Sequence, residues 1–184
     1  DRIDEEVLAA QIEFCVSSGV GGLVTPVMVS EFRVLSEEER RTMVRVPVQV
    51  AGGRTAVVAN CAAVYKPLAV SFAEYDKKWG ADAVFAMPTY TLPPEFDSVF
   101  AYFQAISDAV TIPVWIQNAG VVPLSPDQII RLCTEIERVS WIKEEVMPST
   151  HSIGALVSRN SPDVEGVMGG AGGRYLITER ARGA

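Results

Sequence analysis

Residues 112–146, "IPVWIQNAGVVPLSPDQIIRLCTEIERVSWIKEEV", contain one complete strand–helix–strand unit. The apolar runs "IPVWIQ" (112–117) and "VSWIK" (139–143) are expected to be strands that are buried on both faces. Between them, "LSPDQIIRLCTEIERV" has helical periodicity, with Ser125 as N-cap and Pro126 in the first turn. This order predicts two parallel strands joined by a helix.

The same unit recurs along the chain. Further apolar runs are "GGLVT" (21–25), "TAVVANC" (55–61), "DAVFAM" (82–87) and "VEGVM" (164–168), and the six strand centres lie 25 to 34 residues apart. That spacing is the length of one βα unit. One intervening segment, "LSEEERRTMVRV", begins with the capping-box pair Ser36 and Glu39. We therefore expect six strands that alternate with helices.

Alternation of this kind produces a parallel sheet, either open and doubly wound or closed as a (β/α)8 TIM barrel. The first strand-to-helix loop, "TPVMVSEFRVL", lacks G-x-G-x-x-G, and polar residues follow nearly every strand. Both features favour the barrel. The chain opens on a helical segment and ends in another, so we expect residues 1–184 to form a single, incomplete TIM-barrel domain without its first and last strands.

Composition limits the classes of partner. The 184 residues are 48% hydrophobic and 21% charged, with a formal net charge of -7 and a pI near 4.8. An acidic chain disfavours nucleic acid and anionic membranes. No apolar run reaches the roughly 18 residues of a membrane span, and a cytoplasmic protein is expected. One histidine, three separated cysteines and no CxxC motif argue against a metal site.

In a barrel, chemistry occurs where the strands end. Those ends carry Ser30 and Glu31, Asn60, Thr89 and Tyr90, Gln117 and Asn118, Lys143 with Glu144 and Glu145, and Gly169 and Gly170. Lys143 is the only lysine among them. An amine attacks a carbonyl only when it is deprotonated, and the apolar run before Lys143 favours that form, whereas the two glutamates favour the ammonium. A solvated lysine at the end of a strand is the alternative interpretation.

Several segments together resemble the dihydrodipicolinate synthase / N-acetylneuraminate lyase family of Schiff-base-forming class I lyases. They are "GVGGLV" with "SEFRVLSEEER", "GADAVFAMPTY", "IPVWIQNAG", "WIKEEV" and "VEGVMGG", and they cover nearly the whole chain. The resemblance implies a homo-oligomeric TIM barrel, a dimer or tetramer, in which Lys143 forms an imine with a 2-keto acid and no other cofactor is needed. It also implies that Tyr90 reaches into a neighbouring subunit's site.

Two departures from the family pattern affect the expected substrate. Gln117 stands where the family usually has a tyrosine, and an amide cannot shuttle a proton as a phenol does. Met28 and Val29 replace two adjacent hydroxyl residues, and Ser30 follows them. This combination resembles the branch that dehydrates 2-keto-3-deoxy sugar acids. We therefore expect a dehydratase or aldolase, with pyruvate condensation of the dihydrodipicolinate synthase type as the alternative.

Roles follow for the other candidates. Glu31 is expected as acid or base and Ser30 as a hydroxyl relay, with Gln117 and Asn118 orienting the substrate. Gly169 and Gly170 are expected to let the backbone approach a carboxylate. Each has a structural alternative, because Glu31 can serve a helix dipole, Gln117 can fill the barrel mouth and the glycines can form a turn.

Two other classes of function stay open at this stage. One is a catalytically inert keto-acid sensor, suggested by the missing tyrosine. The other is an open-sheet nucleotide-binding protein, which is suggested only by the glycines of "GGAGGR" (169–174). This segment lacks the Lys-Ser/Thr ending of a P-loop.

Overall fold

A computed structural model describes residues 2–88 and 95–184 of the chain. Its elements, in chain order, are α1 (Glu5–Ser17), β1 (Gly22–Thr25), the 3₁₀ helix η1 (Met28–Ser30), α2 (Glu37–Ala51), β2 (Ala56–Asn60), α3 (Lys66–Trp79), β3 (Ala83–Ala86), α4 (Phe96–Ala109), β4 (Val114–Ala119), α5 (Pro126–Glu135), β5 (Val139–Glu145), α6 (Ser149–Ser158), β6 (Gly166–Gly169) and α7 (Leu176–Arg180).

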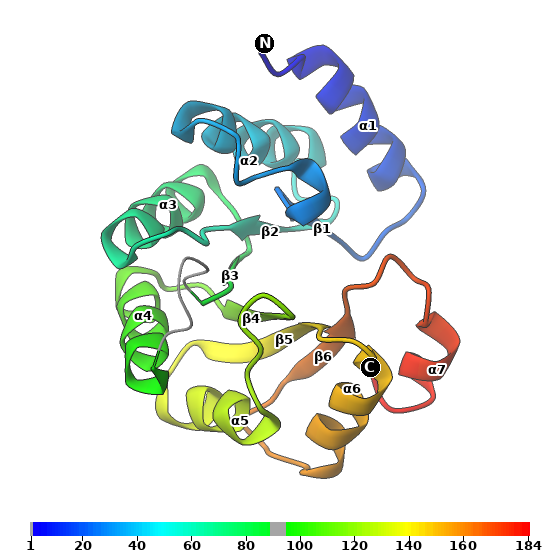
Figure 1. The fold of residues 1–184 in the computed structure, drawn as a ribbon. Helices are drawn as coiled ribbons and strands as arrows, with labels where there is room; N and C mark the ends of the chain where they lie inside the picture. The colour runs from blue at the N-terminus through cyan, green and yellow to red at the C-terminus, as the bar shows by residue number, and fades with distance from the viewer. Residues whose placement is uncertain (1, 89–94) are drawn as a thin grey trace.

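The strands form one parallel sheet in the order β1-β2-β3-β4-β5-β6. In Figure 1 this sheet curls into an arc with the helices on its outer side, and α1 and α7 lie at the two ends of the arc. Sequential neighbours and outer helices are the arrangement of a TIM barrel. The predicted fold, a partial barrel of six βα units, is confirmed.

Helix starts agree with the sequence signals. Ser36 and Glu39 form a capping box at α2, and Ser125 and Gln128 form another at α5. Each pair satisfies backbone N–H groups that would otherwise lack partners. Among the described residues, no helix is both long enough and apolar enough to cross a lipid bilayer.

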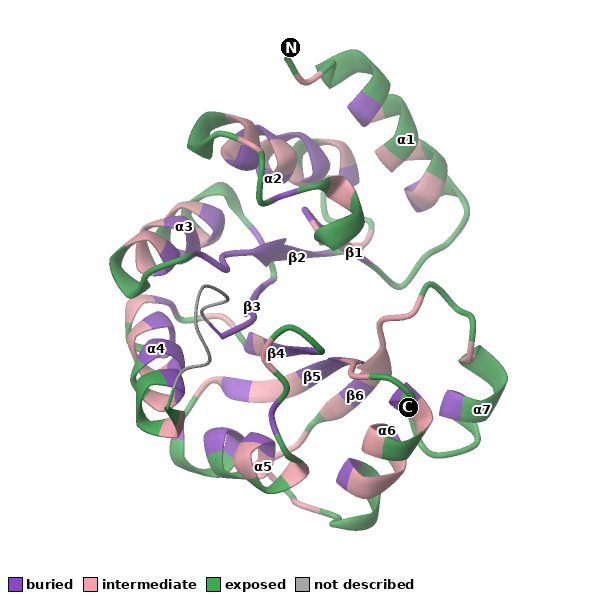
Figure 2. Ribbon diagram, viewed as in Figure 1, coloured by how far each residue is buried: buried purple, intermediate pink, exposed green. Residues whose placement is uncertain are grey.

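The two faces of the sheet carry different side chains because successive residues in a strand point to opposite sides. On the outer side, Ile116 and Ile142 belong to the main core cluster together with Ile129 of α5 and Ile153 of α6. This layer binds the helices to the sheet, and the purple segments of the helices in Figure 2 face it. Burial of such side chains is worth about 1.5–3 kcal/mol each.

A second apolar layer fills the inner side of the arc. Val58, Ala83 and Phe85 form a buried cluster that also contacts Trp115. Trp115 stacks on Trp141 of the next strand, with ring centroids 5.1 Å apart and planes 16° apart. These side chains form an apolar floor, and the next inward-pointing positions on β4 and β5, one step closer to the strand ends, are polar.

Candidate active site

Parallel pairing of β4 and β5 brings Gln117 and Lys143 side by side. The two residues are register partners, and both lie on the inner face directly above the Trp115–Trp141 stack. Gln117 is 0% exposed and Lys143 is 6% exposed. A lysine this buried differs from the solvated lysine at a strand end that was the alternative interpretation, because a buried ammonium requires a partner.

Glu145 is that partner. It lies two residues after Lys143 on β5 and therefore on the same face. One of its carboxylate oxygens accepts a hydrogen bond from Lys143 Nζ, in a close ion pair, and the other accepts one from Gln117 Nε2 at 2.5 Å. The Glu145 side chain is 18% exposed. A single carboxylate thus joins the amine to the amide, with limited access to solvent.

Among the described residues, the carbonyl oxygen of Gln117 has no hydrogen-bond partner although it is buried. Because Gln117 Nε2 is bonded to Glu145, the orientation of the amide is set and Oε1 faces away from that carboxylate. A buried acceptor without a partner costs about 1–3 kcal/mol. A hydrogen-bond donor on a bound ligand would satisfy this oxygen.

Glycines of β6 and its exit shape the same region. A Cβ on Gly166 would overlap the ring of Trp141, and a Cβ on Gly170 would overlap Cγ of Glu145. Gly170 therefore permits Glu145 to stand where it bridges Lys143 and Gln117. A Cβ on Gly169 would overlap the carboxylate of Glu179, which lies on the other face and accepts a hydrogen bond from Ser149 at 2.5 Å. Of the two predicted glycines, only Gly170 adjoins the cluster.

Asn118 points away from this cluster. It follows Gln117 on β4, and its amide donates to Glu144 Oε2 at 2.8 Å and to the carbonyl of Leu124 at 3.2 Å, while its Oδ1 accepts from the N–H of Leu124 at 2.8 Å. The outer face of the sheet therefore holds Asn118 and Glu144, and the inner face holds Gln117, Lys143 and Glu145. Burial raises the pKa of Glu144 to about 6, although the Asn118 and Val146 hydrogen bonds oppose the rise.

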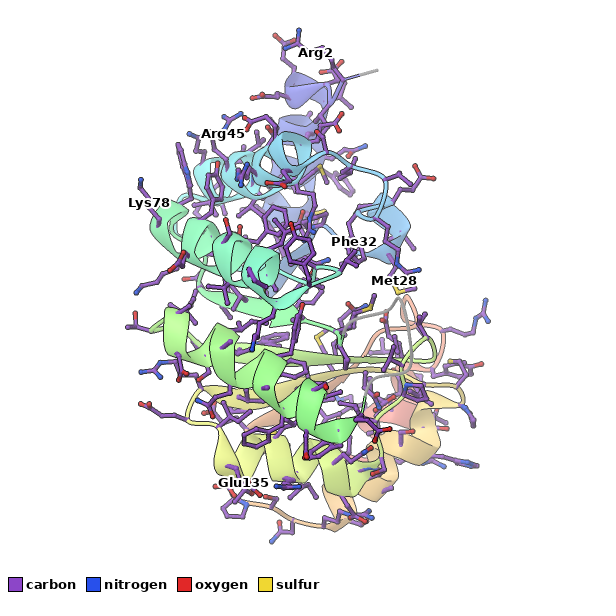
Figure 3. The ribbon with its side chains drawn as sticks, turned by 60° about the vertical axis from the view of Figure 1, so that its left-hand side comes forward. Arg2, Met28, Phe32, Arg45, Lys78 and Glu135 are labelled. Atoms are coloured by element: carbon purple, nitrogen blue, oxygen red, sulfur yellow. The ribbon has the colours of Figure 1, made fainter. Side chains whose placement is uncertain are left out.

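The connection from β1 to α2 carries Ser30 and Glu31. The hydroxyl of Ser30 accepts a hydrogen bond from the N–H of Val27 at 3.2 Å, which closes the η1 turn, and Glu31 follows with a left-handed φ of 54°. Glu31 lines a cavity of about 240 Å³ with Met28 and two other residues of this connection. Figure 3 shows Met28 and Phe32 along this connection.

In the described part of the chain, no hydrogen bond or ion pair joins Ser30 or Glu31 to Lys143, so their predicted roles stay predictions. Tyr90 lies outside the described residues, and its predicted role also stays a prediction. In the described ranges, no cluster of three or more His, Cys, Asp or Glu side chains is arranged to hold a metal ion.

Sequence reasoning did not assign a role to Glu145. A signal was nevertheless present, because two residues separated by one in a strand share a face, and "KEE" (143–145) places one glutamate beside the lysine and the other behind it. The resulting arrangement contains a nucleophilic amine, an adjacent carboxylate that can accept and return protons, and an amide oxygen that is open to a hydrogen-bond donor.

Comparison with known proteins adds three findings. A model of the Dihydrodipicolinate synthetase family matches residues 1–164. A 4-hydroxy-tetrahydrodipicolinate synthase from Hyphomonas neptunium is 35% identical over 133 residues, which are 71% of this chain and 45% of that protein. One from Phenylobacterium zucineum is 32% identical over 146 residues, 78% of this chain and 49% of that protein. The chain spans about half the length of these curated relatives.

Solved structures show the same fold. The dihydrodipicolinate synthase of Aquifex aeolicus superposes with a TM-score of 0.90 at 27% identity, over 98% of this chain and 62% of that one. A prophage protein of the same family from E. coli K12, solved in complex with pyruvate, gives a TM-score of 0.92 over 100% of this chain and 62% of that one. At 21% identity, the second likeness supports the fold alone.

Proposed function

Because the chain belongs to the dihydrodipicolinate synthetase family, we propose that it is part of a Schiff-base-forming lyase that acts on a 2-keto acid through Lys143. Within that class we propose dehydration of a 2-keto-3-deoxy sugar acid. The observation that carries the proposal is the buried Lys143–Glu145–Gln117 cluster, in which one carboxylate contacts both the amine and the amide.

Imine formation needs a neutral amine at Lys143. Glu145 is in hydrogen-bond contact with Nζ and is positioned to take one of its protons. The free amine then attacks C2 of the keto acid, the carbonyl oxygen leaves as water after it gains two protons, and an iminium joins C2 to Nζ. The Trp115–Trp141 floor below the cluster keeps that side of the site free of polar groups.

Dehydration follows from the iminium. The C=N⁺ group acidifies the C3–H bond, and removal of that proton gives an enamine between C2 and C3. The electron pair of the enamine can then expel the hydroxyl on C4, which leaves as water once it is protonated. Glu145 is the nearest described carboxylate, so we assign it both transfers: it takes the C3 proton and returns a proton to the departing hydroxyl. This assignment goes to Glu145 in preference to Glu31, for which no contact with the cluster is described.

Gln117 supports a hydroxylated substrate. Its unpartnered Oε1 is an acceptor, and pyruvate has no hydroxyl group that could donate to it. A 2-keto-3-deoxy sugar acid carries hydroxyls at C4 and beyond, and one of them can fill this position. The roles predicted from the sequence for Tyr90, Ser30, Glu31, Gly169 and Gly170 stay predictions. A homo-oligomer and a cytoplasmic location are also part of the proposal.

Pyruvate condensation is the second candidate function. The two relatives described above carry the name 4-hydroxy-tetrahydrodipicolinate synthase, and one structural neighbour was solved with pyruvate. The same lysine chemistry would serve this reaction, but the position that usually holds a proton-shuttling tyrosine is Gln117, whose amide does not titrate usefully. An inert keto-acid sensor would form little imine or would stop at that stage.

One comparison of rates tests the proposal. The protein at its full natural length is supplied with 2-keto-3-deoxyarabonate, and separately with pyruvate plus an aldehyde. The proposal expects water loss to a semialdehyde at a rate at least about 100-fold above condensation, the lower end of the range attributed to general acid–base groups. Faster condensation would favour the second candidate, and imine formation without turnover of either substrate would favour the sensor.

A further inference from the structure

A pair of polar side chains lies directly behind the Lys143 cluster, on the helix-facing side of the sheet. Asn118 and Glu144 are register partners on β4 and β5, each one residue beyond Gln117 or Lys143. They are 1% and 0% exposed. Neither side chain points toward the inner face where a substrate would bind, because adjacent residues of a strand face opposite sides.

The hydrogen bonds of this pair connect three backbone segments. Asn118 holds Leu124 in the loop after β4 through both its oxygen and its nitrogen, and it donates to Glu144 Oε2 at 2.8 Å. The other oxygen, Glu144 Oε1, accepts from the backbone N–H of Val146 at 2.7 Å. The carboxylate is therefore fixed at one end by β4 and holds the end of β5 with its other oxygen.

The bond to Val146 determines how Glu145 is held. The N–H of Val146 belongs to the peptide group that joins Glu145 to Val146, so its orientation fixes the backbone on the carboxyl side of Glu145. That backbone in turn directs the Glu145 side chain inward, where it contacts Lys143 and Gln117. The amide link to Asn118 keeps β4 and β5 in register at the same level.

We propose that Asn118 and Glu144 are positioning residues, which hold the Glu145 carboxylate against Lys143 and Gln117 without touching the substrate. The proposal rests on the proposed function, since it assigns Glu145 the proton transfers. Under this proposal Asn118 does not contact the substrate, although such contact is the role expected from the sequence. Both of its amide N–H groups are already hydrogen-bonded within the protein.

The chemistry of the pair supports a positioning role rather than simple packing. A buried carboxylate is destabilising unless its oxygens are hydrogen-bonded, and an apolar side chain would fill the same volume without that penalty. Both oxygens of Glu144 have partners, and burial still raises the pKa of its carboxyl to about 6. The benefit of a carboxylate at this position is that it accepts two hydrogen bonds in fixed directions.

The test uses the full natural length of the protein and the variants Glu144→Gln and Asn118→Asp/Glu144→Gln. In the single variant the new amide has one oxygen for two donors, so it loses either the Asn118 bond or the Val146 bond. In the double variant the new carboxylate at position 118 accepts from the amide at position 144, whose oxygen stays with Val146. Glu135→Gln is the control, because Glu135 is exposed on α5 and pairs only with Arg131 among the described contacts.

Four quantities are measured: kcat and KM for 2-keto-3-deoxyarabonate, the rate of borohydride-trapped adduct formation with pyruvate, and the final amount of that adduct. A misplaced proton-transfer group should lower kcat and the trapping rate of Glu144→Gln by about 10- to 100-fold, with KM and the final amount changed less than about twofold. Both kcat and the trapping rate of the double variant should be at least about tenfold above those of Glu144→Gln.

A purely structural role predicts a different result. The final amount of adduct would then fall with the folded fraction, the rate per folded molecule would match the unmodified protein, and the double variant would not recover. That result, or unchanged kcat in Glu144→Gln, would overturn the positioning role alone. If the unmodified protein forms no adduct at Lys143, the proposed function fails, and the positioning role fails with it.

Discussion

The substitution Glu145→Gln separates the chemistry of the cluster from its packing. The new amide has the size of the carboxylate and can still accept from Lys143 Nζ. It can also donate to Gln117 Oε1, which has no partner in residues 2–88 and 95–184, if the Gln117 amide turns over. The hydrogen-bonded arrangement can therefore persist while the group that accepts and returns protons is lost.

Two magnitudes follow. Loss of a general acid–base group should lower kcat for dehydration by about 10²- to 10⁴-fold. Loss of the charged hydrogen bonds around Lys143, which is 6% exposed, should lower the free energy of unfolding by about 2 kcal/mol, or Tm by about 4–8 °C. The protein should stay folded at 25 °C, so the loss of activity is measurable on a native sample.

The assay follows proton transfer directly. Exchange of the C3 protons of pyruvate for deuterium, observed by NMR in D₂O, reports enamine formation without any later step. Glu145→Gln should slow this exchange by the same factor as kcat. Glu165→Gln is the matched control. Glu165 is exposed and lies just before β6, at the end of that strand away from Lys143, where it accepts a hydrogen bond from Trp141. Exchange within about threefold of the unmodified protein would refute the role assigned to Glu145.

Three further predictions concern the surroundings of the cluster. Gln117→Leu removes the acceptor oxygen together with the donor to Glu145, so kcat/KM for 2-keto-3-deoxyarabonate should fall about tenfold while the final amount of borohydride-trapped pyruvate adduct stays within about twofold; equal losses for both compounds would contradict this. The pKa of Glu144 in the folded protein, about 6, lies above its ordinary value of 4.5, so its protonation stabilises the fold fully below pH 4.5 and this contribution is lost as the pH rises through 6. Denaturant titrations should show the stability of the unmodified protein, relative to Glu144→Gln, falling by about 2 kcal/mol from pH 4.5 to pH 7, and a flat difference would exclude the raised pKa. Gly166→Ala should lower the free energy of unfolding by about 1–3 kcal/mol, because the new Cβ would overlap Trp141; Gly21→Ala, which meets nothing within 4 Å, is the control, and equal stabilities for the two variants would contradict the packing described.

The order of the strands and the position of Lys143 could be predicted from the sequence because both depend on local patterns. Apolar runs at the spacing of a βα unit predict sequential parallel pairing, and the end of the fifth run places Lys143 at the mouth of the arc. Capping signals at Ser36 and Ser125 fixed the starts of two helices in the same way.

The partition of the polar residues between the two faces was harder to predict. Asn118 and Gln117 are adjacent in the sequence, and proximity along the chain suggested a shared role, but strand alternation places them on opposite faces. Glu145 was treated as a neighbouring charge of Lys143, although its contact with Gln117 depends on the register of β4 against β5. Register and the side chains of neighbouring strands are tertiary properties, which a single strand's sequence does not contain.

The most direct test of the central proposal is to identify the residue that forms the imine. The protein at its full natural length is reduced with borohydride in the presence of pyruvate or 2-keto-3-deoxyarabonate, and the modified peptide is sequenced by mass spectrometry. We expect the reduced adduct on Lys143, its loss in Lys143→Ala, and no adduct on exposed lysines such as Lys78 (Figure 3). A folded protein in which Lys143 stays unmodified with every 2-keto acid tested would contradict the proposal.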